Sequence, residues 1–68
     1  MEEKITAWVS RDDVGDKIVL HLHKPYIKEE GMWKSSFIPR VLEQDLFPDI
    51  KWEDEEPTEV ELTIKICK

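Results

Sequence analysis

The stretch Lys51-Trp-Glu-Asp-Glu-Glu-Pro-Thr-Glu-Val-Glu-Leu-Thr-Ile-Lys-Ile-Cys67 joins an acidic turn and a proline to a strictly alternating run. From Val60 to Ile66 every second residue is apolar, and the residues between them are charged or polar. Successive side chains of a β-strand point to opposite faces of the sheet. This period of two therefore predicts a strand with one apolar and one polar face.

Two earlier segments show the same alternation, and a short turn separates them. Residues 4–10 and residues 17–23 each place aliphatic side chains on one face. Residues 11–16 between them are rich in turn-forming Asp and contain Gly15, which adopts positive φ without steric cost. Two strands joined by an Asp/Gly turn predict a β-hairpin.

The middle of the chain is less regular. We interpret residues 26–31 as a charged connection and residues 32–38 as a third strand. Residues 39–47 are the one helical candidate, because Pro39 suits a first helical position and Pro48 ends the segment. The expected fold class is mainly β: a small antiparallel sheet of three to four strands with one short helical turn, α or 3-10, before the last strand.

The length of 68 residues predicts a single small domain, residues 1–68. A chain of this size buries only about 60% of its unfolded surface, so little protein is left to enclose a deep active site. The apolar positions of the three clearest strands and of the helical candidate form the expected core: Ile5, Ala7, Val9, Ile18, Leu20, Leu22, Val60, Leu62, Ile64, Leu42, Leu46 and Phe47.

Negative charge is concentrated in one segment. Residues 43–61 hold nine acidic residues and a single base, Lys51, whereas the whole chain carries a net charge of −6. One interpretation is an acidic docking surface for a basic partner. A second is a solvated turn that protects a sheet edge, and a third is internal pairing with the bases of residues 17–40. The candidate binding residues are two aromatic anchors and four acids: Trp8, Trp52, Glu53, Asp54, Glu55 and Glu56.

The sequence also contains candidate residues for a metal site, for nucleophilic catalysis and for nucleic-acid binding. His21 and His23 would lie about 6.5–7 Å apart on one strand face, a spacing that suits two metal ligands, but no third ligand is evident. No motif activates a serine or cysteine as a nucleophile, so we expect no enzyme, no catalytic residue, no metal and no cofactor. Aromatic and basic residues interleave over 26–37, which is typical of a platform for single-stranded nucleic acid, although the negative net charge disfavours this partner.

The composition also bears on location. The lone cysteine, Cys67, cannot form an internal disulfide, and no apolar run is long enough for a signal peptide or a membrane helix. We therefore expect a cytoplasmic protein with an unidentified protein partner and no membrane contact. A homodimer through an edge strand or Cys67 is the other arrangement that the sequence allows.

Three phrases carry a resemblance: Ala7-Trp-Val-Ser-Arg-Asp12, Leu46-Phe-Pro-Asp-Ile-Lys-Trp52 and Trp52-Glu-Asp-Glu-Glu-Pro-Thr-Glu-Val-Glu-Leu62. Together they resemble a set of small uncharacterised proteins of gut anaerobic bacteria and their phages or mobile elements. The resemblance implies a bacterial or phage accessory protein and transfers no site residue. The expected function is a non-enzymatic protein-interaction module with an acidic surface. The alternatives are a protein that associates with single-stranded nucleic acid and a histidine-based metal-binding protein.

Overall fold

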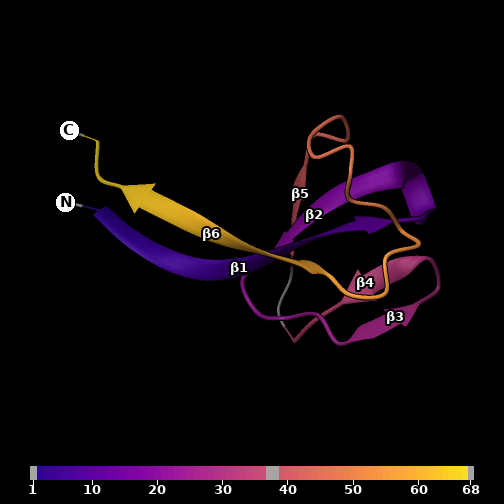
Figure 1. The fold of residues 1–68 in the computed structure, drawn as a ribbon. Coiled ribbons are helices and arrows are strands. Elements are labelled where there is room, and N and C mark those ends of the chain that lie inside the picture. The colour runs from indigo at the N-terminus through magenta and orange to yellow at the C-terminus, as the bar shows by residue number, and fades with distance from the viewer. Residues whose placement is uncertain (1, 37–38, 68) are drawn as a thin grey trace.

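The computed structural model describes residues 2–36 and 39–67, and antiparallel strands dominate it (Figure 1). No α-helix occurs in this part of the chain, so the mainly β class is confirmed. The elements, in chain order, are β1 (Glu2–Asp12), the 3-10 turn η1 (Val14–Asp16), β2 (Lys17–His21), β3 (Ile27–Glu29), β4 (Met32–Lys34), β5 (Arg40–Leu42) and β6 (Thr58–Lys65).

Strand β1 is the axis of the fold. It pairs with β2 through residues 8–12 and with β6 through residues 2–9, in a four-stranded sheet of order β5-β2-β1-β6. Strands β3 and β4 form a separate hairpin. Because β2 and β5 end before the start of β1 is reached, the first part of β1 and the last part of β6 project as a two-stranded arm (Figure 1).

Two local predictions need correction. The predicted helix over residues 39–47 is wrong, because residues 40–42 form β5 and pair with β2, and residues 43–50 form turns. Nine residues between prolines are too few for a stable helix, so the open edge of β2 captures the segment. The helical turn lies instead between the first two strands, at η1. The connection over residues 26–31 also contains a strand, β3.

The third strand was predicted too long. Strand β4 covers residues 32–34 of the predicted 32–38, and residues 37–38 lie outside the described residues. The first hairpin and the last strand are confirmed, with β1 and β2 joined by a tight turn.

The predicted core is correct at its centre and wrong at its margins. Ala7, Val9 and Ile18 are buried, and three further predicted residues pack around them: Leu20, Leu42 and Val60. Several predicted core residues are exposed instead: Ile5, Leu22, Leu46, Phe47 and Ile64. Ile5 and Ile64 lie on the projecting arm, where no second layer covers their apolar face.

Both faces of the sheet are covered in the body of the protein. On one face Ile50, from the turns that follow β5, packs against Val9 and Ile18. On the opposite face lies the β3–β4 hairpin, with Trp33 buried and its amide donating to Asp12 Oδ1 at 3.0 Å. The sheet is thus the middle of three layers. The sequence did not predict the layer that the β3–β4 hairpin forms.

Candidate functional site

An open groove lies between the β3–β4 hairpin and the acidic loop, which we define as residues 53–56. Its volume is about 660 Å³. Tyr26 on its wall is 67% exposed, whereas Trp33 is 7% exposed. The lining consists of two prolines, two aromatic residues, two lysines and two glutamates: Pro25, Pro57, Tyr26, Trp33, Lys24, Lys28, Glu55 and Glu56. A concave surface of this size with apolar walls and a few charged groups is typical of a ligand site.

Lys28 holds the two sides of this groove together. Its Nζ lies 4.3 Å from the ring centroid of Trp52 and 5.3 Å from that of Trp33. The same amine donates to the carbonyl oxygen of Trp52 and, at 3.0 Å, to that of Asp54. Strand pairing sets Lys28 opposite Trp33, which directs the amine toward the loop. Cation–π attraction and two backbone acceptors therefore fix the loop against the hairpin.

The acidic loop also carries its own local bracing. The amide of Lys51 donates to Asp54 Oδ2 at 3.1 Å, and the amide of Asp54 donates to the Lys51 carbonyl at 3.2 Å. Turns in which an aspartate side chain bonds a nearby backbone amide are common for this residue type. Asp54 is accordingly half-buried and structural, which distinguishes it from its exposed neighbours.

Glu53, Glu55 and Glu56 are exposed, and none of them forms an ion pair within residues 2–36 and 39–67. Lys28 reaches this loop through carbonyl oxygens and not through carboxylates. The expected pairing of the acidic segment with the bases of residues 17–40 is therefore not formed at the acidic loop. Its negative charge faces solvent beside the groove.

The two candidate aromatic anchors have different surroundings. Trp52 is half-buried under Lys28. Trp8 is also half-buried and sits on β1 between His21 of β2 and Glu59 of β6. Residues 39–52 do not supply a cover for Trp8 through Ile50. Ile50 from that segment packs on the opposite face of the sheet, and neither tryptophan lines the groove.

A buried polar cluster lies under the β3–β4 hairpin. Ser10 Oγ is 2.9 Å from His21 Nε2, and Ser35 Oγ is 3.3 Å from His21 Nδ1. Burial lowers the pKa of His21, and the nearby Asp12 carboxylate opposes this effect in part. Ser10 and His21 are almost completely buried, so a substrate has no access to this pair. The arrangement joins two strands of the sheet to the segment after β4.

The histidine pair predicted from the sequence is not formed. Strand β2 ends at His21, which points into the buried cluster, whereas His23 is exposed beyond the strand. Among the described residues, no group of three or more His, Cys, Asp or Glu side chains is arranged to hold a metal ion.

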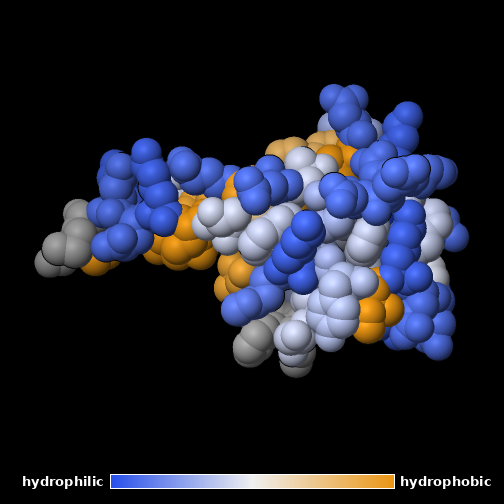
Figure 2. Space-filling model, turned by 60° about the horizontal axis from the view of Figure 1, so that its bottom comes forward, coloured by the Kyte–Doolittle hydropathy of each residue, from blue (hydrophilic) through white to orange (hydrophobic). Residues whose placement is uncertain are grey.

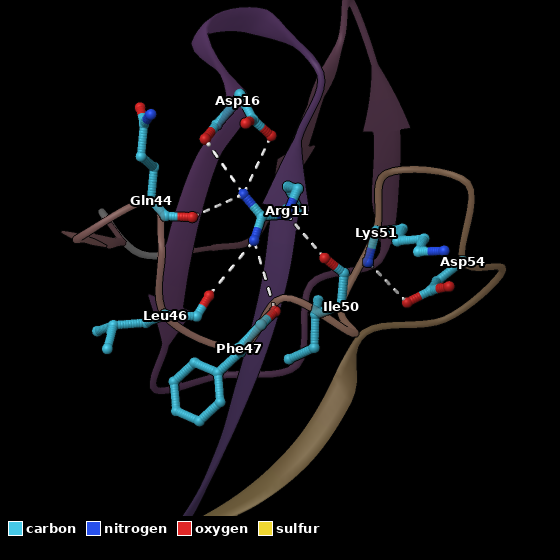
Figure 3. A network of polar contacts seen from close by, with 8 residues as sticks. All are labelled: Arg11, Asp16, Gln44, Leu46, Phe47, Ile50, Lys51 and Asp54. Atoms are coloured by element: carbon cyan, nitrogen blue, oxygen red, sulfur yellow. Dashed lines mark hydrogen bonds and ion pairs between the residues drawn. The ribbon is translucent and has the colours of Figure 1, made fainter.

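Arg11 makes the densest polar network among the described residues, and it was not predicted as a site residue from the sequence (Figure 3). Its Nε donates to the Ile50 carbonyl at 2.7 Å. Its two other nitrogens reach the carbonyl oxygens of Gln44, Leu46 and Phe47 and the side chain of Asp16. A signal existed, because Arg11 continues the inward-facing series of Ala7 and Val9 on β1. An arginine at such a position predicts a buried set of acceptors.

Comparison with protein-family models, with curated proteins and with solved structures finds no match for this chain. The site is thus defined by its geometry alone. Pro25 and Pro57 also line it, and neither was among the binding residues predicted from the sequence. The part of the chain that the structure describes holds no helix with the length and apolar character needed to span a bilayer.

Proposed function

We propose that this protein is a non-enzymatic protein-interaction module that binds an extended, basic segment of a partner in the groove beside the acidic loop. The observation that carries the proposal is the juxtaposition of an aromatic and proline-lined groove with exposed, unpaired glutamates. The likeness to accessory proteins of bacteria and their phages, noted from the sequence, is compatible with such a role.

The groove offers two kinds of contact to such a segment. Tyr26, Trp33 and the two prolines present apolar surface to aliphatic stems or rings, and aromatic-lined grooves commonly receive extended peptides. Glu55 and Glu56 line the same groove, where they would attract Lys or Arg side chains. Charge at the rim mainly raises the association rate and fixes the orientation of the partner.

The alternative of single-stranded nucleic acid has less support. Trp33 is buried, and Lys28 is occupied by two rings and two carbonyl groups. The hydrogen bond that Lys34 donates to Glu29 raises the pKa of Lys34, which also pairs with Glu30. Trp33, Lys28 and Lys34 therefore serve the fold, and glutamates flank the two lysines.

A peptide array that scans Lys, Arg, Pro and aromatic residues in extended ten-residue peptides tests the proposal. Binders are titrated against the wild type and against the triple variant Glu53→Gln, Glu55→Gln, Glu56→Gln, which leaves the structural Asp54 intact. We expect the triple variant to bind at least tenfold more weakly in low salt, with most of the loss in the association rate.

A matched control removes the same charge elsewhere, through Glu2→Gln, Glu3→Gln and Glu43→Gln. This control should bind as the wild type does, and Tyr26→Ala should weaken binding without loss of fold because Tyr26 is exposed. Equal binding by the triple variant, or tryptophan quenching by single-stranded DNA but by no peptide, contradicts the proposal.

A further inference from the structure

Strand β6 forms a long open edge of the sheet. It is the outermost strand on its side and pairs with β1 over residues 58–65. The opposite edge strand, β5, spans only residues 40–42 and follows Pro39. Proteins protect sheet edges by keeping them short or by placing proline and charge on them, and an unprotected edge invites another strand to pair. β6 contains no proline or glycine, and its charged residues, Glu59, Glu61 and Lys65, are of both signs. Among the described residues, β1 is the one strand beside it.

The projecting arm also exposes an apolar face. Ile64 is 52% exposed and Ile66 is 57% exposed, and Ile5 lies on the same face. Where the arm meets the body, Leu62 borders an open hollow of about 440 Å³ that Leu20 and Leu22 also line. Figure 2 shows apolar side chains gathered along the arm with hydrophilic ones beside them. A small protein that leaves this strip uncovered has surface suited to association.

We infer that β6 pairs antiparallel with β6 of a second copy, with Leu62 on the twofold axis, so that the two sheets become continuous. This inference is independent of the groove and its proposed function. In this register the two residues of each opposed pair lie equally far along the chain before and after Leu62. Glu59 faces Lys65, Val60 faces Ile64, Glu61 faces Thr63 and Leu62 faces its own copy.

Charge and the length of paired strand together select this register. Each Glu59 meets an opposite charge, Lys65, and the symmetry forms this pair twice. A shift of the axis to Glu61 sets two glutamates directly opposite each other, which is unfavourable in a sheet. A shift to Thr63 sets Glu61 opposite Lys65 but pairs only residues 61–65 of β6, whereas the Leu62 register uses residues 59–65. An axis that falls between two residues sets apolar side chains opposite polar ones.

Packing favours the same register. Opposed residues share a face, so Ile64 of each copy lies beside Val60 of the other. Val60 is half-buried and packs against the core formed by Val9, Ile18 and Ile50. The arm of one copy would thus extend the core of its partner. Ile64 would thereby gain an apolar neighbour that it lacks in the monomer.

Sedimentation velocity and cysteine cross-linking of the full chain test the inference. The wild type should show a concentration-dependent dimer with reductant present, because Cys67 plays no part. In a Cys67→Ser background, Leu62→Cys should form a disulfide-linked dimer on mild oxidation, since directly opposed strand residues have the Cα separation that a disulfide needs. Thr63→Cys in the same background is the matched control and should cross-link at least tenfold more slowly.

Charge exchange gives a second readout that does not depend on cysteine. Glu59→Lys and Lys65→Glu should each raise the dissociation constant of the dimer about tenfold, because two symmetry-related pairs change from attraction to repulsion. The double variant should recover an affinity close to that of the wild type. Recovery by the double variant attributes the losses in the single variants to this charge pair.

Three results would overturn the inference. The first is a wild type that stays monomeric at millimolar concentration. The second is faster cross-linking through Thr63→Cys than through Leu62→Cys, which would identify the other register. The third is an unchanged dissociation constant of the dimer in each of the two single variants. That result would indicate packing of the apolar arm faces without pairing of the strand edges.

Discussion

Ser10 Oγ lies 2.9 Å from His21 Nε2, and this contact joins β1 to β2 beneath the β3–β4 hairpin. Both side chains are almost completely buried, so neither atom has water as a substitute partner. A buried imidazole with its two nitrogens held by Ser10 and Ser35 tolerates either neutral tautomer, because a hydroxyl both donates and accepts. This cluster is accordingly a fixed point of the fold.

Ser10→Ala should destabilise the protein. The variant leaves His21 Nε2 buried without its hydroxyl partner, and such a loss costs about 1–3 kcal/mol. Urea unfolding followed by tryptophan fluorescence measures the change. Ser36→Ala, at an exposed position after β4, is the matched control and should unfold as the wild type does. Equal stability of Ser10→Ala and the wild type would show that the contact contributes nothing.

Stability should fall in mild acid because of His21. Burial lowers the pKa of this imidazole in the folded protein below its ordinary value of about 6.5. The unfolded chain therefore binds a proton first as pH falls through about 6.5, and folding loses free energy until the folded-state pKa is reached. Well above pH 6.5, His21 is neutral in the folded and the unfolded state and adds nothing to the pH dependence of stability. Urea unfolding at successive pH values measures the slope.

Comparison with two histidine variants assigns that slope. His21→Gln should remove it, whereas His23→Gln, which changes an exposed histidine beyond β2, should retain it. A wild type whose stability is flat between pH 7 and pH 5 would contradict the assignment.

Arg11→Lys should loosen the turns that follow β5. The guanidinium contacts four backbone carbonyl groups in residues 44–50, and a single ammonium cannot reproduce this fork. We expect a loss of about 1.5–3 kcal/mol, the range for hydrogen bonds to a charged group. Hydrogen exchange should show faster exchange over residues 43–50. Arg40→Lys, at an exposed position of β5, serves as the control, and unchanged exchange in Arg11→Lys would refute the role.

Gly31→Ala should destabilise the β3–β4 turn for two reasons. Gly31 has φ of 75°, which costs a residue with a Cβ roughly 1–2 kcal/mol. The new Cβ would also lie 2.5 Å from Cγ2 of Val14, in the 3-10 turn. Thermal unfolding of Gly31→Ala, Val14→Ala and the double variant separates the two causes. The double variant should be more stable than additivity of the single changes predicts, and strict additivity would exclude the clash.

The sequence predicted those parts of the fold that depend on local patterns and missed those that depend on contacts between distant residues. Alternation over residues 60–66 and 17–23 is a property of each segment alone, and it located β6 and the start of β2, although β2 ends at His21. β5 depends on the open edge of β2, which no local pattern contains, so residues 40–42 read as helix. Ile5 and Ile64 carry a core pattern but lie where no layer faces them.

Part of the candidate site could also be predicted, because that part depends on local composition. Acidic composition identified Glu55 and Glu56, because charge density is visible in the sequence itself. The groove beside them arises where the hairpin meets the loop, and Lys28 makes that junction through contacts far apart in the chain. The sequence allowed His21 and His23 as an alternative pair of metal ligands because the end of β2 at His21 could not be predicted from the sequence.

The pairing of Glu2 with Lys65 at the tip of the arm has a mechanical consequence. A pulling force applied to these two positions would load the ladder between β1 and β6 one hydrogen-bonded pair at a time, because those bonds run perpendicular to the strands. The arm would open like a zipper from its tip at low force. The body, where β1 is held on both sides, would resist longer, and extension of the single molecule would proceed in two distinct steps.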